Sequence, residues 1–233
     1  MGAEANGAKT LIIAIDGPSG AGKGTIAREL AARLRYRHVD TGAMYRAVAW
    51  KAIAEGLDLQ DESAVAALSE RARFDLEAGR AVIDGSDVSQ AIRTPEIDAA
   101  ATTVARHPAV RRVLVARQQD IGRAGGVVME GRDIGTVVFP DADVKIYLDA
   151  SAEERARRRV NDAAHSGGHV GQAAVAEAIA ARDQSDTTRA ASPLTAAPEA
   201  VRIDTTRMSI DEVVDHVMAL VHQTRTRVDE SND

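Results

Sequence analysis

One glycine-rich segment carries the residue types that bind a phosphate chain: Gly17-Pro18-Ser19-Gly20-Ala21-Gly22-Lys23-Gly24-Thr25. Its first glycine stands five residues before the Gly22-Lys23 pair, which is the spacing of a P-loop. Backbone N–H groups of such a loop wrap phosphate oxygens, the helix N-terminus that follows favours negative charge, and Lys23 reaches the β- and γ-phosphates. An apolar run at 11–15 and helical spacing from 26 supply the strand and helix that the motif requires. The segment therefore predicts a site for a nucleoside triphosphate.

The position after Lys23 departs from the usual P-loop, in which a serine or threonine hydroxyl binds Mg²⁺. Here that position is Gly24, and the hydroxyl follows at Thr25. We expect Mg²⁺ to be held mainly by phosphates and water, with Thr25 and the strand-end acid Glu130 contributing. Asp16, just before the loop, either orients Lys23 or makes structural hydrogen bonds. The form Gly-Lys-Gly-Thr is also that of adenylate kinase and its relatives.

Strands and helices are expected to alternate around this loop. Apolar runs predict strands at 11–15, 127–129, 144–148 and 201–204, with a short segment at 38–39. Helical spacing and capping residues predict helices at 26–35, 43–54, 62–71, 95–123 with a break at 108, 151–162, 172–183 and from 209. Residues 73–87 are typical of a hairpin insertion, and Ser151 with Glu154 predicts a capping box. This alternation indicates an α/β fold with a parallel sheet covered on both faces.

Composition narrows the class of protein. The chain has 233 residues, enough for one α/β domain with embellishments or for two small lobes. The absence of cysteine excludes disulfides and thiolate chemistry, and a formal charge of -6 argues against a nucleic-acid binder. Its apolar runs are far shorter than the ~20 residues of a membrane span. We expect a cytoplasmic protein with neither nucleic acid nor membrane as a partner.

Further motifs follow the loop in the order found in one family. They are Asp40-Thr41-Gly42-Ala43-Met44-Tyr45-Arg46, Glu130-Gly131-Arg132-Asp133-Ile134-Gly135-Thr136-Val137-Val138-Phe139-Pro140, Lys145-Ile146-Tyr147-Leu148-Asp149-Ala150-Ser151, Glu153-Glu154-Arg155-Ala156, and Arg182-Asp183 with Asp186 and Arg189-Ala190. From 12 to about 220 the chain therefore resembles bacterial cytidylate kinase. The resemblance implies a three-layer P-loop kinase fold with a central five-stranded parallel sheet, a small NMP-binding lobe with a β-hairpin insertion, and a short lid.

The resemblance also implies domain limits. A single P-loop kinase domain would span 11–225, between disordered tails at 1–10 and 226–233. Within it the core would comprise 11–40, 124–152 and 190–225, the NMP-binding lobe about 41–123 and the lid about 153–189.

For the acceptor phosphate, the resemblance implies a grip by Arg46, Arg132 and Arg189, assisted by the Thr41 hydroxyl. Guanidinium groups suit this role because their paired N–H donors match phosphate oxygens. A surface ion pair is the alternative for any one of these arginines. Tyr45, beside Arg46, belongs to the same substrate-binding set.

For the base, cytosine requires an acceptor for its N4 amino group and a donor for N3 and O2. The resemblance implies that Asp133 accepts from N4, which matches carboxylate pairing in groove readout, while Arg111 donates to the ring and Thr102 adds a hydroxyl. Uracil reverses the pattern at positions 3 and 4 and should fit worse. Arg182 and Asp186 would contact the ribose.

Three arginines at 155, 158 and 159 have i, i+3 and i+4 spacing and share a helix face. Beside Gly167-Gly168 they resemble a mobile lid that closes on the transferred phosphoryl group, with a solvated basic face as the alternative. ATP would be held by 17–25 and Arg158. The implied catalytic set is Lys23, Arg132, Arg155, Arg159 and Arg189.

The function implied is transfer of the γ-phosphate of ATP, with Mg²⁺, to CMP or dCMP by a monomeric enzyme. One rival is a kinase with another acceptor, such as UMP, AMP or a small hydroxy acid, against which Arg111, Asp133 and the insertion argue. A second rival is a regulatory module that binds ATP without transferring phosphate, which would not need two arginine-rich phosphate sites.

Overall fold

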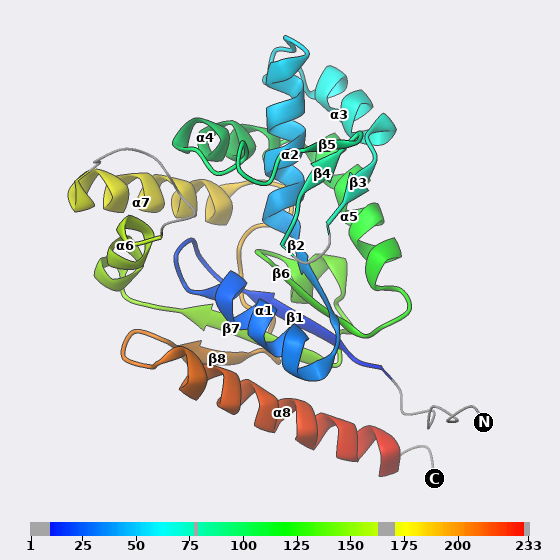
Figure 1. Ribbon diagram of the computed structural model, residues 1–233, viewed down its shortest axis with the longest axis vertical. Helices are drawn as coiled ribbons and strands as arrows, with labels where there is room; N and C mark the ends of the chain where they lie inside the picture. Colours follow the sequence, from blue (N-terminus) through cyan, green and yellow to red (C-terminus); the bar gives the residue numbers. More distant parts are fainter. Residues whose placement is uncertain (1–9, 77–78, 163–170, 231–233) are drawn as a thin grey trace.

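A five-stranded sheet forms the centre of the molecule, and all its neighbouring strands are parallel (Figure 1). The computed structural model describes residues 10–76, 79–162 and 171–230. In spatial order the strands are β2 (Arg37–Asp40), β6 (Val127–Gly131), β1 (Ile12–Asp16), β7 (Val144–Asp149) and β8 (Val201–Asp204). This order confirms the α/β class and the central five-stranded parallel sheet.

Helices cover both faces of this sheet and make three layers. On one face α1 (Lys23–Leu34) and α8 (Ile210–Glu230) pack against aliphatic side chains of β1, β7 and β8. On the other face lie α5 (Pro108–Gly122) and a π-helical turn, η1 (Ile134–Val138). All five residues of β6 are buried, as expected for a parallel strand between two helical layers.

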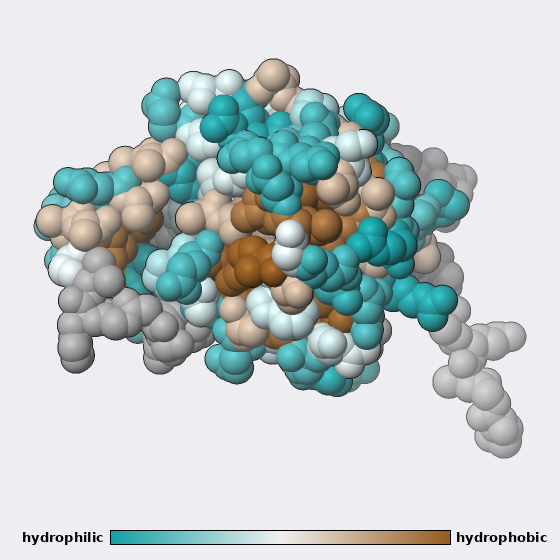
Figure 2. All heavy atoms as spheres, turned by 90° about the horizontal axis from the view of Figure 1, so that it is seen from above, coloured by the Kyte–Doolittle hydropathy of each residue, from teal (hydrophilic) through white to brown (hydrophobic). Residues whose placement is uncertain are grey.

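A smaller lobe with its own aliphatic core stands above the sheet. It is built from α2 (Thr41–Ala54), α3 (Glu62–Arg71), α4 (Pro95–Val104), part of α5 and the strands β3 (Phe74–Asp75), β4 (Val82–Ile83) and β5 (Ser86–Asp87). The predicted hairpin insertion is therefore a three-stranded antiparallel sheet, in which β4 pairs with both neighbours. Seen from the end of α2 and α3, hydrophobic side chains gather at the middle of the molecule and hydrophilic ones surround them (Figure 2).

The helix starts of this lobe follow from local chemistry. Asp40 and Thr94 accept from backbone N–H groups three residues later, at 2.9 and 3.3 Å, and so cap α2 and α4. Proline lacks an N–H and is tolerated only in the first turn. The predicted break at Pro108 is accordingly a real boundary, where α4 has ended and α5 begins.

The segment predicted to form the lid contains two helices, α6 (Ala152–Val160) and α7 (Gln172–Thr188), which pack against each other. The Ser151 hydroxyl caps α6 as predicted, but the return bond from Glu154 is not formed, because that carboxylate binds Arg157 and Arg158 instead. Helix α7 also runs five residues beyond the predicted end at 183. Its last turns are polar, and pairing of Asp186 with arginines makes their burial tolerable. The glycine pair at 167–168 lies outside the described residues.

Helix α8 continues to Glu230, past the expected boundary at 225. Arg225 donates to the Tyr36 hydroxyl at 2.8 Å and stacks on the ring, which ties this part of the helix to the core. Residues 1–9 and 231–233 lie outside the described chain. Among the described helices, none is both long and apolar enough to cross a membrane.

Candidate active site

A cavity of about 960 Å³ opens where β1, β2 and β6 end, between the sheet, the small lobe and the lid helices. Carboxyl ends of parallel strands are the usual position for ligands in such sheets. Its walls come from the glycine-rich loop, α2, α4, α5, the β6–η1 connection, α6, α7 and residues 205–213. Of the site residues predicted from the sequence, all line this cavity except Gly17, Pro18 and Arg155.

The glycine-rich loop connects β1 to α1 in the predicted strand–loop–helix arrangement. Lys23 is the first residue of α1, and its ammonium donates to the Pro18 carbonyl at 2.7 Å. Burial, and then the nearby charge of Arg132, lower the pKa of Lys23 to about 7. An anion bound in the loop would offset that burial and favour the charged lysine.

Asp16 makes structural hydrogen bonds to the backbone of η1. Its two carboxylate oxygens accept from the backbone N–H groups of Ile134 and Gly135, each at 2.8 Å. Burial raises the pKa of Asp16 to about 6 despite these bonds. The carboxylate therefore holds the start of η1, an element the sequence pattern did not predict, and with it the neighbouring Arg132 and Asp133.

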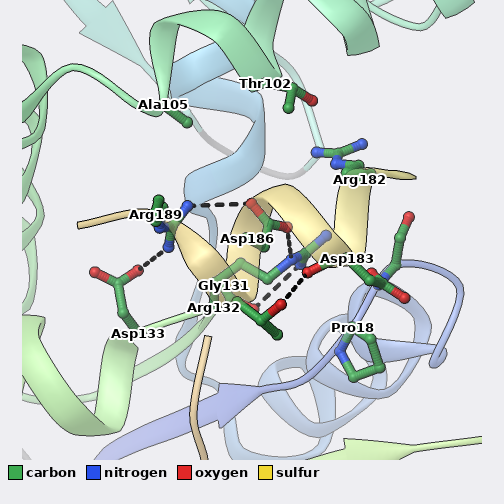
Figure 3. Close-up of polar contacts among 12 residues, drawn as sticks. Pro18, Thr102, Ala105, Gly131, Arg132, Asp133, Arg182, Asp183, Asp186 and Arg189 are labelled. Carbon is green, nitrogen blue, oxygen red and sulfur yellow. Dashed lines mark hydrogen bonds and ion pairs between the residues drawn. The ribbon is translucent and has the colours of Figure 1, made fainter. Parts of the chain in front are cut away.

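Five arginines from the small lobe, the end of β6 and the helices α6 and α7 pair with aspartates around the cavity. Asp186 accepts from Arg132 at 2.9 Å and from Arg189 at 3.1 Å (Figure 3). Asp98 accepts from Arg182 at 3.1 Å and also pairs with Arg159. Arg46 pairs with Asp40 at 2.9 Å.

The electrostatics of this cluster favour an anion. Burial alone would raise the pKa of Asp186, but Arg132 and Arg182 hold it below its usual value. Burial, together with Arg132, lowers the pKa of Arg182, and burial with Arg111 lowers that of Arg189. These cations repel one another, so a bound phosphate would stabilise them all.

Buried polar atoms without a hydrogen bond point to the same conclusion. Among the described residues, the Arg46 Nε, the Tyr45 hydroxyl and the Arg189 Nη2 atoms are buried without a hydrogen bond. Buried donors of this kind are costly unless a ligand satisfies them. The Thr41 hydroxyl, by contrast, donates to the Glu130 carbonyl at 2.7 Å and can only accept from a ligand.

A buried ion pair lines part of the cavity. The Arg111 guanidinium donates to Asp133 at 2.5 Å, and the two side chains are only 4% and 8% exposed. Arg189 stands 3.7 Å from the other Asp133 oxygen (Figure 3). Arg111 also stacks on the Tyr45 ring at 5.4 Å, and burial raises the pKa of that phenol to about 12. The Thr102 hydroxyl, which donates to the Asp98 carbonyl at 2.9 Å, also lies on the cavity wall.

The arginines at 155, 158 and 159 contact three different parts of the molecule. Arg158 donates to the hydroxyl and carbonyl of Thr205 at 2.9 and 2.6 Å, and Arg159 pairs with Asp98. Arg155 lies behind the loop, where it donates to the Ser19 carbonyl at 3.1 Å and pairs with a carboxylate of α7. The shared helix face therefore does not deliver Arg155 to the cavity.

The metal-ligand candidates are sparse. Thr25 is exposed on the cavity wall, whereas the buried Glu130 carboxylate lies beside Gly24. No group of three His, Asp or Glu side chains suited to a metal ion occurs in the described part of the chain. These donors fit an ion held largely by phosphate and water, and not a cage made by the protein.

Sequence reasoning missed three carboxylates of the site. Asp98 pairs with two arginines, and Asp40 pairs with Arg46. Asp183 accepts from the Ser19 N–H at 3.1 Å and pairs with Arg155. Asp40 could have been found as the residue before a helix, a common capping position. Asp183 belongs to the Arg182-Asp183 motif, but no local signal indicates its partners, and Asp98 has no local signal at all.

Comparison with known proteins agrees with this geometry. A family model described as cytidylate kinase matches residues 13–223. A cytidylate kinase of Solibacter usitatus (strain Ellin6076) is 47% identical over 227 residues, which cover 97% of both chains. One from Bacillus subtilis (strain 168) is 47% identical over 92% of this chain and 98% of the relative, and one from Pelotomaculum thermopropionicum is 50% identical over 90% and 95%.

Proposed function

The chain belongs to the cytidylate kinase family, a family of phosphotransferases, and on that premise we propose that it moves the γ-phosphate of ATP to CMP or dCMP. The products would be ADP and CDP or dCDP. The observation that carries this specificity is the buried Arg111–Asp133 pair, which places a donor and an acceptor together on the cavity wall.

The pair suits cytosine and disfavours uracil. Asp133 would accept from the N4 amino group, and Arg111 would donate to N3 and O2. Uracil would turn O4 toward the carboxylate and N3–H toward the guanidinium, leaving two buried groups unpaired. Thr102 would add a hydroxyl that can accept a hydrogen bond.

The acceptor phosphate would lie between the base pocket and the glycine-rich loop. Arg46, Arg132 and Arg189 bring buried N–H donors there, and Thr41 and Tyr45 add hydroxyls. The ribose would lie beside Arg182 and Asp186. Because Asp186 already binds two arginines, it can take up a sugar hydroxyl only by sharing its oxygens.

ATP would lie with its phosphates along 17–25, and Arg158 would hold the donor side through its position beside Ala21 and Thr205. The fold family implies Mg²⁺, which would neutralise phosphate charge when bound, with Thr25 and Glu130 as its protein contributions. Phosphoryl transfer to an anionic acceptor needs no strong general base, so the protein acts mainly by position and charge. Lys23, Arg132, Arg159 and Arg189 supply that charge, and Arg155 contributes through the loop it supports.

The test is ADP production with Mg-ATP and each of CMP, dCMP, UMP, AMP and shikimate. We expect turnover on CMP or dCMP, and a loss of about 100-fold in kcat/KM in Asp133→Asn, because opening one partner of a buried charge pair typically costs about 3 kcal/mol. Asp120→Asn, which removes a carboxylate from an exposed pair with Arg123, is the matched control and should leave turnover unchanged.

Two results would contradict the proposal. Turnover only on another acceptor would remove the assignment of the base pocket, and ATP binding without any transfer would favour a regulatory module. Location in the cytoplasm and a monomeric state belong to the same proposal; sedimentation analysis of the purified chain tests the second.

A further inference from the structure

His38 lies beside the proposed site, in contact with Glu130, and is not one of the proposed binding residues. It belongs to β2, which pairs in parallel with β6, and its Nε2 atom stands 3.0 Å from Glu130 Oε1. The two side chains are 10% and 9% exposed, so water competes little for this hydrogen bond. The backbone of Glu130 is fixed as well, because its carbonyl accepts from the Thr41 hydroxyl at 2.7 Å.

The same carboxylate lies against the glycine-rich loop. A Cβ atom at Gly24 would stand 3.1 Å from Glu130 Oε1 and 3.6 Å from Oε2. The first distance is tighter than an ordinary contact, so a side chain at this position would have to push the carboxylate away. Gly24 occupies the position where the usual P-loop has its Mg²⁺-binding hydroxyl. The carboxylate therefore stands beside the position that the missing hydroxyl would have occupied.

The position of the Glu130 carboxylate beside Gly24 depends on its hydrogen bond to His38. Its side chain has three rotatable bonds, and the positive charges of Lys23 and Arg132 act on it from the cavity side. A hydrogen bond from His38 to Oε1 opposes rotation toward those cations and leaves Oε2, 3.6 Å from a Cβ position at Gly24, without that partner.

We propose that His38 is a positioning residue, which holds the Glu130 carboxylate beside Gly24 so that it replaces the absent loop hydroxyl in supporting Mg²⁺ bound to ATP. This inference deepens the proposed function and rests on it. Removing a residue that orients a metal-binding side chain typically changes metal affinity by about 10- to 100-fold. The effect should appear in metal-dependent binding and not in nucleotide binding as such.

The test compares the affinity for a non-hydrolysable ATP analogue in Mg²⁺ and in EDTA, by calorimetry and without CMP. In His38→Leu the ratio of the two affinities should fall about tenfold, with binding in EDTA unchanged. His38→Gln, which restores an N–H donor at similar reach, should recover most of the ratio. The matched control is His107→Leu, which also loses an imidazole hydrogen bond, to Leu59 O at 2.8 Å, but far from the loop. An unchanged ratio in His38→Leu overturns the inference, as does a loss that Gln does not recover.

A double-mutant cycle separates positioning from stability. In a Glu130→Gln background, adding His38→Leu should change the Mg²⁺ ratio less than twofold, because the group it positions is already lost. A further full tenfold loss in that background would mean that His38 acts elsewhere. CMP turnover by the parent chain tests the proposed function separately, so either idea can fail while the other stands.

Discussion

Gly17 is the loop position at which one added methyl group should do the most damage. A Cβ atom there would stand 2.0 Å from the Leu148 carbonyl oxygen of β7, where ordinary contacts begin near 3.4 Å. The loop or the strand would have to move by more than about 1 Å, and misplacement on that scale typically costs about 100-fold in rate. β7 cannot easily yield, because it is hydrogen-bonded to β1 on one side and to β8 on the other. The φ of 147° at Gly17 adds strain for any other residue.

We therefore expect Gly17→Ala to lower kcat/KM for ATP by at least about 100-fold. The matched control is Gly56→Ala, at the end of α2, where φ is 70° but no atom lies within 4 Å of the added carbon. That variant pays only the left-handed strain of about 1–2 kcal/mol in the free energy of unfolding and should keep its kinetics. Steady-state kinetics and thermal unfolding of both variants separate contact from strain. Equal kcat/KM in the two variants would refute the reasoning.

Two further predictions concern charges around the loop. Because burial lowers the pKa of Lys23 to about 7, binding of a triphosphate at pH 8 should take up close to one proton as the lysine recharges, and affinity should fall as pH rises above 7. Calorimetry in buffers of different ionisation enthalpy measures this uptake, and its persistence in Lys23→Met would contradict the assignment. Arg155 lies outside the cavity and supports the loop through the Ser19 carbonyl, so Arg155→Met should mainly raise KM for ATP. Arg159 lines the cavity, so Arg159→Met should mainly lower kcat. Kinetics of the two variants decide this, and a pure kcat loss in Arg155→Met would return that arginine to the catalytic set.

Features encoded in short segments could be predicted from the sequence. The loop chemistry needs a contiguous run from 17 to 25, and its strand and helix follow directly along the chain. Caps such as Ser151 and the break at Pro108 depend on residues within one helical turn. The family resemblance added site residues, such as Arg111, whose residue type alone would indicate only a surface charge.

The elements that were missed depend on distant partners. The turn η1 has no periodic signal, and it is held by Asp16, more than a hundred residues earlier in the chain. Helix α7 was predicted too short because its final polar turns are stabilised by arginines of other segments. The capping box predicted at Ser151 is incomplete because the Ser151 N–H donates to the Thr206 hydroxyl, 55 residues later, while the Glu154 carboxylate binds Arg157 and Arg158.

By itself, the sequence determined the α/β class, the phosphate loop and the set of charged residues from which the site is built. Only the tertiary structure decided which charges meet. Glu130 is 92 residues from His38, and Asp98 is 84 from Arg182, so no local pattern relates them. The physical reason is that a charge is paired by whatever the fold brings within about 4 Å, and a low-dielectric interior makes that choice energetically large. An arginine is a solvated surface residue when the fold leaves it exposed, and part of a phosphate site when the fold buries it beside the end of a strand.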